Sequence, residues 1–381
     1  MKIVIAGGDG FCGWATSLRL AKAGHEILII DNLSRRKIDI DLNTKSLTKI
    51  SSIADRIKEA NSIIGHITFK ELDISKNYHD LFSVISSFKP DSIVHFAEQR
   101  SAPYSMIGEP QRRYTVENNI STTQNLLSCI VDLNTNIHFV HLGTMGVYGY
   151  DIKYGRIPEG YLDITINETN QTDKVIYPPN PGSIYHLTKV LDHQIMQFYK
   201  KNWGIPITDL HQGIVWGVQT TETKESDMLI NRFDYDGIYG TVLNRFIVQA
   251  LNDHPITVYG TGGQTRAFIH IDDTAECIKI AIENLPHNEK VRVLNQVSET
   301  HSVIDLANIV SKKFKGKIVN YENPRVELKE NELDVSNEGF KSLGFKPKLL
   351  SDELLNDVSF LNIKNSATFD ASKVLNSPNW R

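Results

Sequence analysis

The glycine-rich stretch at residues 7–13 constrains the fold more than any other feature. It reads GGDGFCG, follows an apolar run and precedes a helical stretch. Glycines at this place allow a tight strand-to-helix turn, and they let backbone N–H groups approach a pyrophosphate at the helix N-terminus. Asp31 lies 18 residues after Gly13, at the end of the second apolar run. A carboxylate at this position accepts hydrogen bonds from the ribose hydroxyls of a bound dinucleotide. The pattern therefore predicts a dinucleotide-binding fold.

Apolar runs alternate with helical stretches through the first half of the chain. Strands are expected at residues 3–6, 27–30, 67–69, 92–96, 138–141, 206–210 and 292–295. Helices are expected at residues 13–23, 81–88 and 118–131. Because this alternation requires right-handed crossovers, the strands should form a parallel sheet. We therefore predict an α/β fold, a Rossmann-type doubly wound parallel sheet with a smaller mixed C-terminal substrate-binding domain.

The length of 381 residues favours two domains. We expect an NAD-binding domain from residues 1–216 plus about 267–300, interleaved with a UDP-sugar-binding domain from 217–266 plus about 301–381. Residues 33–66 are longer than a normal crossover, and we interpret them as an insertion with a helix at 53–60. Residues 220–236 are polar and are expected to be irregular.

Composition excludes several classes of protein. Lys plus Arg total 41 against 45 Asp plus Glu, a net charge of −4 that gives no argument for nucleic-acid or membrane-surface binding. No apolar run reaches the roughly 20 residues of a membrane span.

Cys12, Cys129 and Cys277 are too far apart in sequence for a disulfide framework or a metal knuckle. The histidines show no ligand spacing, so we expect no metal. The chain starts directly on a strand, and we expect a cytoplasmic enzyme.

Tyr185 and Lys189 are spaced for a shared role in catalysis. They are four residues apart in YHLTK, so on a helix they share one face. A lysine cation favours the phenolate, which makes the tyrosine a base for a hydroxyl proton. Thr144, in LGTMG, follows the expected strand at 138–141 and is placed to hydrogen-bond the same hydroxyl. The three residues predict oxidation of an alcohol.

These residues resemble the extended short-chain dehydrogenase/reductase group, whose nucleotide-sugar members include 4-epimerases and 4,6-dehydratases. Further stretches extend the likeness along the whole chain to the UDP-sulfoquinovose synthase family: DNLSRR, HFAEQRSAPYSM, DYDGIYGTVLNRF, TVYGTGGQTR and NPRVE. The resemblance implies UDP-glucose and sulfite, or a sulfite donor protein, as partners, retained NAD as cofactor, and a homodimer or higher homo-oligomer. It also implies C4 oxidation, loss of water across C5 and C6, sulfite addition at C6, and reduction of C4.

The resemblance also implies site residues. Those for the cofactor are Gly7, Gly10, Phe11, Cys12, Gly13, Asp31, Asn32, Leu33, Ser34, Arg36, Asp73, Ile74, Arg100, Asn119, Tyr185, Lys189, Gln212 and Val215. Those for the substrate are Arg100, Thr144, Tyr185, Gln212, Val242, Leu243, Asn244, Arg245, Thr257, Val258, Tyr259, Gln264, Thr265, Arg266 and Arg325. Asp31 should repel the 2′-phosphate of NADP and so favours NAD. Arg35 and Arg36 point the other way, because guanidinium groups bind phosphates well and so favour NADP. Asp73 is equally suited to a helix N-cap.

The dehydration step needs a proton-transfer group. Dehydratase relatives carry an acidic pair after the threonine, where this chain has Met145 and Gly146. His186 titrates near neutral pH and is our candidate for the C5/C6 proton, the alternative being a histidine turned away from the sugar. Three functions remain in competition: the sulfonating enzyme, a UDP-glucose 4-epimerase or 4,6-dehydratase, and a non-catalytic NAD-sensing regulator. The last would not need Thr144, Tyr185 and Lys189 together.

Overall fold

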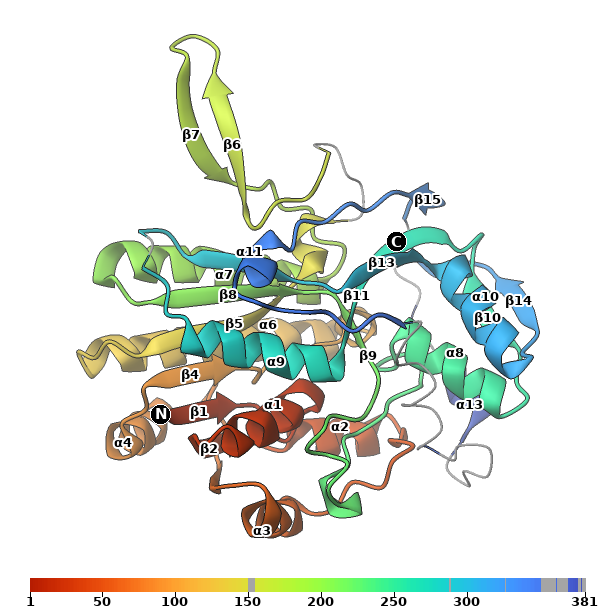
Figure 1. Ribbon diagram of the computed structural model, residues 1–381, viewed down its shortest axis with the longest axis horizontal. Helices are drawn as coiled ribbons and strands as arrows, with labels where there is room; N and C mark the ends of the chain where they lie inside the picture. The colour runs from red at the N-terminus through yellow and green to blue at the C-terminus, as the bar shows by residue number, and fades with distance from the viewer. Residues whose placement is uncertain are drawn as a thin grey trace.

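A seven-stranded parallel sheet forms the centre of the molecule (Figure 1). The computed structural model describes residues 1–149, 155–287, 289–325, 327–350, 361, 369–375 and 378. The strands lie in the order β12-β8-β5-β4-β1-β2-β3, and every neighbouring pair is parallel. They are β1 (Lys2–Ala6), β2 (Glu26–Asp31), β3 (Ile67–Glu71), β4 (Ser92–His95), β5 (His138–Thr144), β8 (Ile207–Gln212) and β12 (Arg292–Gln296). All seven expected strands and the predicted fold class are confirmed.

Helices cover both faces of this sheet, which explains the unbroken apolar strands. In β1, Ile3 and Ile5 pack with α1 (Phe11–Lys22) and α9 (Ile271–Glu283). The alternate residues of β1, Val4 and Ala6, pack toward the other face. The helices of that face are α4 (Tyr78–Phe88), α6 (Glu109–Asp132) and α7 (Ile184–Trp203).

A second group of elements follows β8 and has its own core around Trp216, Phe246 and Val258. Its helices are α8 (Val242–Leu251) and α10 (Val303–Phe314). Its strands are β9 (Ile214–Trp216), β10 (Ile256–Tyr259), β11 (Gly263–His270), β13 (Glu299–Ser302), β14 (Ile318–Tyr321) and β15 (Glu330–Asn331). Because β9 starts just after β8 ends and pairs with β11, the chain passes directly from the central sheet into this group. The exact division into two domains stays a prediction.

The remaining elements include several that sequence patterns did not predict. The 33–66 insertion contains α3 (Ile53–Ile63), as expected, and also α2 (Ser34–Asp41). A hairpin of β6 (Tyr161–Ile166) and β7 (Gln171–Ile176) stands away from the body (Figure 1). Its residues are largely exposed, so no apolar alternation marks it. The short elements are α5 (Ala102–Ser105), η1 (Met145–Tyr148), η2 (Asp227–Leu229), α11 (Glu338–Ser342) and α13 (Ala371–Val374). No helix in the described part of the chain is long and apolar enough to span a membrane.

Candidate active site

A continuous cavity lies at the carboxyl ends of the central strands. Its lining includes the residues that end or directly follow β1, β2, β3, β4, β5 and β8, and it continues to α8 and β11 of the second group. In the sheet order, β1 lies between β2 and β4, which is where the direction of winding reverses. Ligands of doubly wound sheets bind at this place, so the topology puts the site where the glycine turn begins.

The glycine turn is packed too tightly for any other residue at two of its positions. Gly7 has φ +84°, and a Cβ built on it would lie 2.7 Å from the backbone nitrogen of Ala97. A Cβ on Gly13 would lie 2.2 Å from the carbonyl oxygen of Gly7. The helix α1 therefore starts directly against the end of β1, and its first residues, Phe11, Cys12 and Gly13, line the cavity. This cradle fits the diphosphate of a dinucleotide.

Asp31 lines the same part of the cavity with its acceptor oxygens already oriented. The backbone N–H groups of Asp9 and Leu33 donate to its carboxylate at 2.9 and 2.7 Å. Burial, with a further contribution from the charge of Asp9, raises the pKa of Asp31 to about 6. A carboxylate fixed in this way can accept from ribose hydroxyls and would repel a 2′-phosphate.

The two arginines that favoured NADP are held by other carboxylates. Arg36 donates through Nε and Nη2 to both oxygens of Asp9, at 2.6 and 2.8 Å, and does not line the cavity. Arg35 lines the cavity, but its guanidinium pairs with Asp39 and Asp234. The sequence did not point to Asp9, whose carboxylate also binds Arg56. The arrangement favours NAD over NADP.

Asp31→Asn should weaken NAD binding and lessen discrimination against NADP. Loss of a charged acceptor costs about tenfold or more in affinity. The carboxyl pKa of about 6 adds a pH dependence. In the unmodified protein NAD affinity should fall as the pH drops through 6, because the neutral acid is the poorer acceptor, whereas in the variant it should not. Titration calorimetry with both dinucleotides measures this. Glu71→Gln, at an exposed position beside Asp31 on β3, is the control, and equal NAD affinity in all three proteins would contradict the prediction.

Tyr185 and Lys189 occupy the first two turns of α7, and both line the cavity. Ser183 begins this helix, since its Oγ accepts from the N–H of His186 at 3.2 Å. Burial raises the pKa of Tyr185, while the Lys189 charge and a hydrogen bond with Thr144 act in the opposite direction. Thr144 ends β5 and also lines the cavity. The structure thus brings the predicted trio together, one member from β5 and two from α7.

Glu98, which no sequence pattern indicated, holds Lys189 in place. Its Oε2 lies 2.8 Å from the Lys189 Nζ, and Lys189 also donates to the carbonyl oxygen of Leu142 at 2.6 Å. The other Glu98 oxygen lies 3.1 Å from Nε2 of both His95 and His141. The side chain of Glu98 is almost fully buried and also lines the cavity. Lys189 therefore carries its charge beside a buried carboxylate.

Two buried clusters of histidine and carboxylate side chains continue behind Lys189. One is formed by His95, Glu98 and His141, and the other by His193, Asp209 and His211. Asp209 joins them, since its oxygens lie 2.8 Å from His141, 2.7 Å from His193 and 2.9 Å from His211. Sequence spacing could not reveal these groups because each combines residues of one segment with a histidine from another: His141 on β5 joins His95 and Glu98, and His193 on α7 joins Asp209 and His211. Each of the four histidines has a ring nitrogen within 3.1 Å of a carboxylate oxygen, and the expectation of no metal stays a prediction.

Three arginines of the second group line the far end of the cavity: Arg245 on α8, Arg266 on β11, and Arg325. Arg245 is buried, and its Nε has no hydrogen-bond partner among the described residues. The pKa of Arg245 is lowered, mainly by burial and also by the positive charge of Arg325. Arg266 pairs with Glu327. A buried guanidinium with an unused donor suits an anionic ligand such as a diphosphate.

Most of the predicted residues line this one cavity. Those that do are Gly7, Gly10, Phe11, Cys12, Gly13, Asp31, Asn32, Ser34, Asp73, Ile74, Arg100, Thr144, Tyr185, His186, Lys189, Gln212, Val215, Val242, Arg245, Tyr259, Gln264, Arg266 and Arg325. The others do not: Leu33, Arg36, Asn119, Leu243, Asn244, Thr257, Val258 and Thr265.

Several of the predicted residues outside the lining pack in the core or make hydrogen bonds within the protein. Leu243 and Val258 are in the core of the second group. The side chain of Asn244 accepts from the N–H of Gly217. Asn119 lies beneath the site, where its Nδ2 donates to the carbonyl oxygen of Gln99 at 3.1 Å and so supports the loop after β4.

Comparison with known proteins agrees with this geometry. Residues 3–295 match the model of the NAD dependent epimerase/dehydratase family. A chloroplastic UDP-sulfoquinovose synthase of Spinacia oleracea is 43% identical over 100% of this chain and 79% of its own. A UDP-sulfoquinovose synthase of Sulfolobus acidocaldarius is 41% identical over 91% of this chain and 89% of its own. The crystal structure of a UDP-glucose 4-epimerase of Thermotoga maritima superposes with a TM-score of 0.70, 21% identity, and coverage of 94% and 98% of the two chains.

Proposed function

The chain belongs to the NAD-dependent epimerase/dehydratase family, and on that premise we propose that it converts UDP-glucose and sulfite into UDP-sulfoquinovose. The observation that carries the proposal is the meeting of Thr144, Tyr185 and Lys189 with a glycine turn in one cavity. Relatives that carry the name UDP-sulfoquinovose synthase, at 41–43% identity, support the choice of product. The nucleotide sugar is bound at the arginine end of the cavity, and the nicotinamide end of NAD meets it at Tyr185.

The cofactor fits the residues present. The cradle at Gly7 and Gly13 accepts a diphosphate, and Asp31 offers fixed acceptors for ribose hydroxyls. When bound, NAD supplies reversible oxidation at C4 of the sugar. Since that oxidation is reversed before the product leaves, the cofactor returns to its starting state. This chemistry consumes no NAD, so the protein has no need to release it between turnovers.

Tyr185 takes the proton of the C4 hydroxyl and later returns it. Thr144 hydrogen-bonds the same hydroxyl and keeps it directed at the phenol oxygen. Lys189 supplies the positive charge that lowers the Tyr185 pKa against the effect of burial. A C4 ketone acidifies the hydrogen on C5, which is what makes departure of the C6 hydroxyl feasible. Arg245, with Arg266 and Arg325, binds the UDP diphosphate and so fixes the sugar relative to Tyr185.

Gly146 leaves room for the ring of His186, which lines the cavity. A Cβ on Gly146 would lie 2.3 Å from Cδ2 of His186. Burial, and then the charges of Arg325 and Arg266, lower the His186 pKa to about 3, so the imidazole is neutral and able to accept a proton. A bound diphosphate would offset the two arginine charges and make His186 more basic. We propose that His186 takes the C5 proton in the substrate complex.

His186→Gln should uncouple the two halves of the reaction. The C4 oxidation depends on Tyr185, so the 4-keto sugar should still form, and borohydride reduction can trap it. Formation of the sulfonated product should fall about 10²-fold or more, the usual contribution of one acid–base group. His79→Gln, at an exposed position on α4, is the control. Full turnover by the His186 variant would show that another group moves this proton.

Sulfite and the assembly state complete the proposal. Sulfite reaches C6 either free or from a donor protein, and the enzyme acts as a homodimer or higher homo-oligomer. The decisive experiment is incubation with UDP-glucose and ³⁵S-labelled sulfite, followed by chromatography of the nucleotide sugars. We expect a labelled sulfonated product that requires both substrates. UDP-galactose, formed equally with and without sulfite, would instead identify an epimerase and overturn the proposal.

A further inference from the structure

The segment 231–241, between η2 and α8, closes part of the cavity although it has no regular secondary structure. Residues 231–239 are all buried. Residues 237–241 line the cavity, together with the glycine turn and with Arg35 and Arg100. A segment that is polar, irregular and yet buried needs specific contacts to hold it, since it has no ladder or helix bonds of its own.

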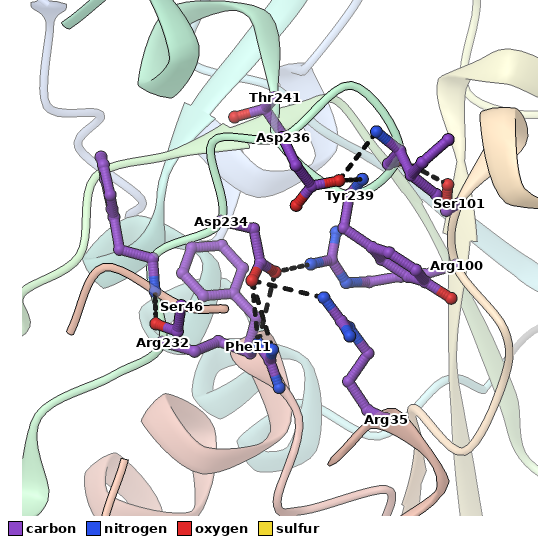
Figure 2. A network of polar contacts seen from close by, with 12 residues as sticks. Phe11, Arg35, Ser46, Arg100, Ser101, Arg232, Asp234, Asp236, Tyr239 and Thr241 are labelled. Carbon is purple, nitrogen blue, oxygen red and sulfur yellow. Dashed lines mark hydrogen bonds and ion pairs between the residues drawn. The ribbon is translucent and has the colours of Figure 1, made fainter. Parts of the chain in front are cut away.

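Asp234 provides the main attachment (Figure 2). Its buried carboxylate lies 2.8 Å from Arg100 Nη2, 3.3 Å from Arg35 Nη2 and 3.2 Å from Arg232 Nη2. The arginines come from three places: α2, the loop after β4, and the segment itself. One carboxylate therefore joins the second group of elements to two parts of the central domain that flank the cavity.

Tyr239 and Ser101 make a second set of attachments. The guanidinium of Arg35 lies 3.7 Å from the ring centroid of Tyr239, a stacking distance. Ser101 Oγ donates to the carbonyl oxygen of Ile238. Within the segment, Asp236 accepts from the N–H groups of Ile238 and Tyr239, both at 2.8 Å, which fixes the turn (Figure 2). Contacts with the central domain therefore hold the segment at Asp234 and again at Ile238 and Tyr239.

The arginines of this cluster also face the place where a dinucleotide diphosphate would bind. Arg100 lies 5.8 Å from the ring of Phe11, which belongs to the glycine turn. Arg35 lines the cavity, and its buried Nε has no hydrogen-bond partner among the described residues. Asp39 and Asp234 pair directly with the three arginines, and Arg35 and Arg100 lie between these carboxylates and the glycine turn.

We propose that the segment 231–241 is a cover over bound NAD and that Asp234 is the residue that fastens it, so that the cofactor is retained between turnovers. This deepens the proposed function, since it rests on NAD being the cofactor, but it does not depend on which sugar is made. The cover continues directly into α8, which carries Arg245. The residues proposed to retain the cofactor and the arginine proposed to bind the nucleotide sugar therefore follow one another in the chain.

Asp234→Asn separates this proposal from a simple charge effect, because the two predict opposite changes in how tightly NAD is held. Removing the carboxylate leaves Arg35, Arg100 and Arg232 without their shared anion. If Asp234 acted only through charge, the added positive potential should bind the NAD diphosphate more tightly. If Asp234 fastens the cover, NAD should instead leave faster, by about tenfold or more, since hydrogen bonds to a charged group are lost.

The test measures retained cofactor and needs no sugar. The holoprotein is loaded with ¹⁴C-labelled NAD, passed through gel filtration and chased with unlabelled NAD, and the release rate is compared between variants. Hydrogen exchange of residues 231–241 is followed in the same samples. Asp227→Asn, an exposed aspartate on η2 in the same part of the chain, is the matched control. We expect slow release from the unmodified protein and the control, and fast release with faster exchange from Asp234→Asn.

Release that is unchanged or slower in folded Asp234→Asn would overturn the proposal. If that variant does not fold, Arg100→Gln replaces it, because Arg100 is one-third exposed and its loss leaves Asp234 paired with Arg232. Arg100→Gln should raise both NAD release and exchange of residues 231–241. Faster release without faster exchange would mean that Arg100 only contacts the cofactor, and that would also contradict the cover. A protein that retains NAD but makes no sulfonated sugar would refute the proposed function alone.

Discussion

Tyr185→Phe should lower turnover of UDP-glucose and sulfite by about 10²–10⁴-fold, the range that one general acid–base group contributes. The substitution removes only the phenol oxygen, so the ring and the start of α7 are kept. The hydroxyl of Thr144 cannot substitute as a base, because its own proton is held too strongly. Both C4 oxidation and the later reduction use this oxygen, and the loss should therefore appear in every product of the enzyme.

The measurement is kcat for sulfonated product together with the amount of bound NAD. Bound NAD should be unchanged, because the dinucleotide is held at the glycine turn and Asp31. Tyr199→Phe is the control: Tyr199 lies further along the same helix and bonds Gln124 and Ser128, away from the cavity. If Tyr185→Phe kept more than a tenth of the activity, a different base would have to act at C4.

The sheet could be predicted from the sequence because each strand is buried on both faces. Burial of β1 on two sides requires an unbroken apolar run, and the glycine turn after it marks where α1 begins. The β6–β7 hairpin escaped prediction for the opposite reason, since its exposed residues carry no such signal. Residues 220–236 were expected to be irregular, and residues 231–236 are, but their polar composition gave no sign that they are buried, because their charges pair with groups that only the fold brings near.

The candidate site divides along similar lines. Tyr185 and Lys189 could be found because both lie on one helix, four residues apart. Glu98 could not, because its contact with Lys189 depends on β4 lying beside β5 and on the direction of α7, neither of which a local pattern contains. The same is true of Arg36: its charge was visible in the sequence, but its partner Asp9 became apparent only in the fold.

Glu98→Gln should shift the pH dependence of turnover as well as reduce stability. In the native protein the Glu98 carboxylate raises the pKa values of both Tyr185 and Lys189. Its removal should lower both. Because the phenol must lose its proton to act as a base, the acidic limb of the kcat profile should move to lower pH. Because Lys189 must stay charged, the alkaline limb should also move to lower pH.

The stability effect follows from burial of the same ion pair. Without Glu98, Lys189 faces His141, whose pKa Asp209 still raises. Breaking a buried pair in this way costs about 3–5 kcal/mol, and the melting temperature should fall accordingly. A lower melting temperature alone, however, would fit a structural role as well as a catalytic one.

The control for Glu98→Gln is Glu159→Gln, which removes a partly buried, hydrogen-bonded carboxylate. Glu159 accepts from the N–H groups of Asn295 and Gly339 and does not line the cavity. It should lower the melting temperature and leave both limbs of the pH profile in place. If Glu98→Gln behaved in the same way, Glu98 would only support the fold. Parallel movement of both limbs to lower pH requires instead that Glu98 sets the charge balance of the Tyr185–Lys189 pair, because its charge acts on the pKa values of both residues.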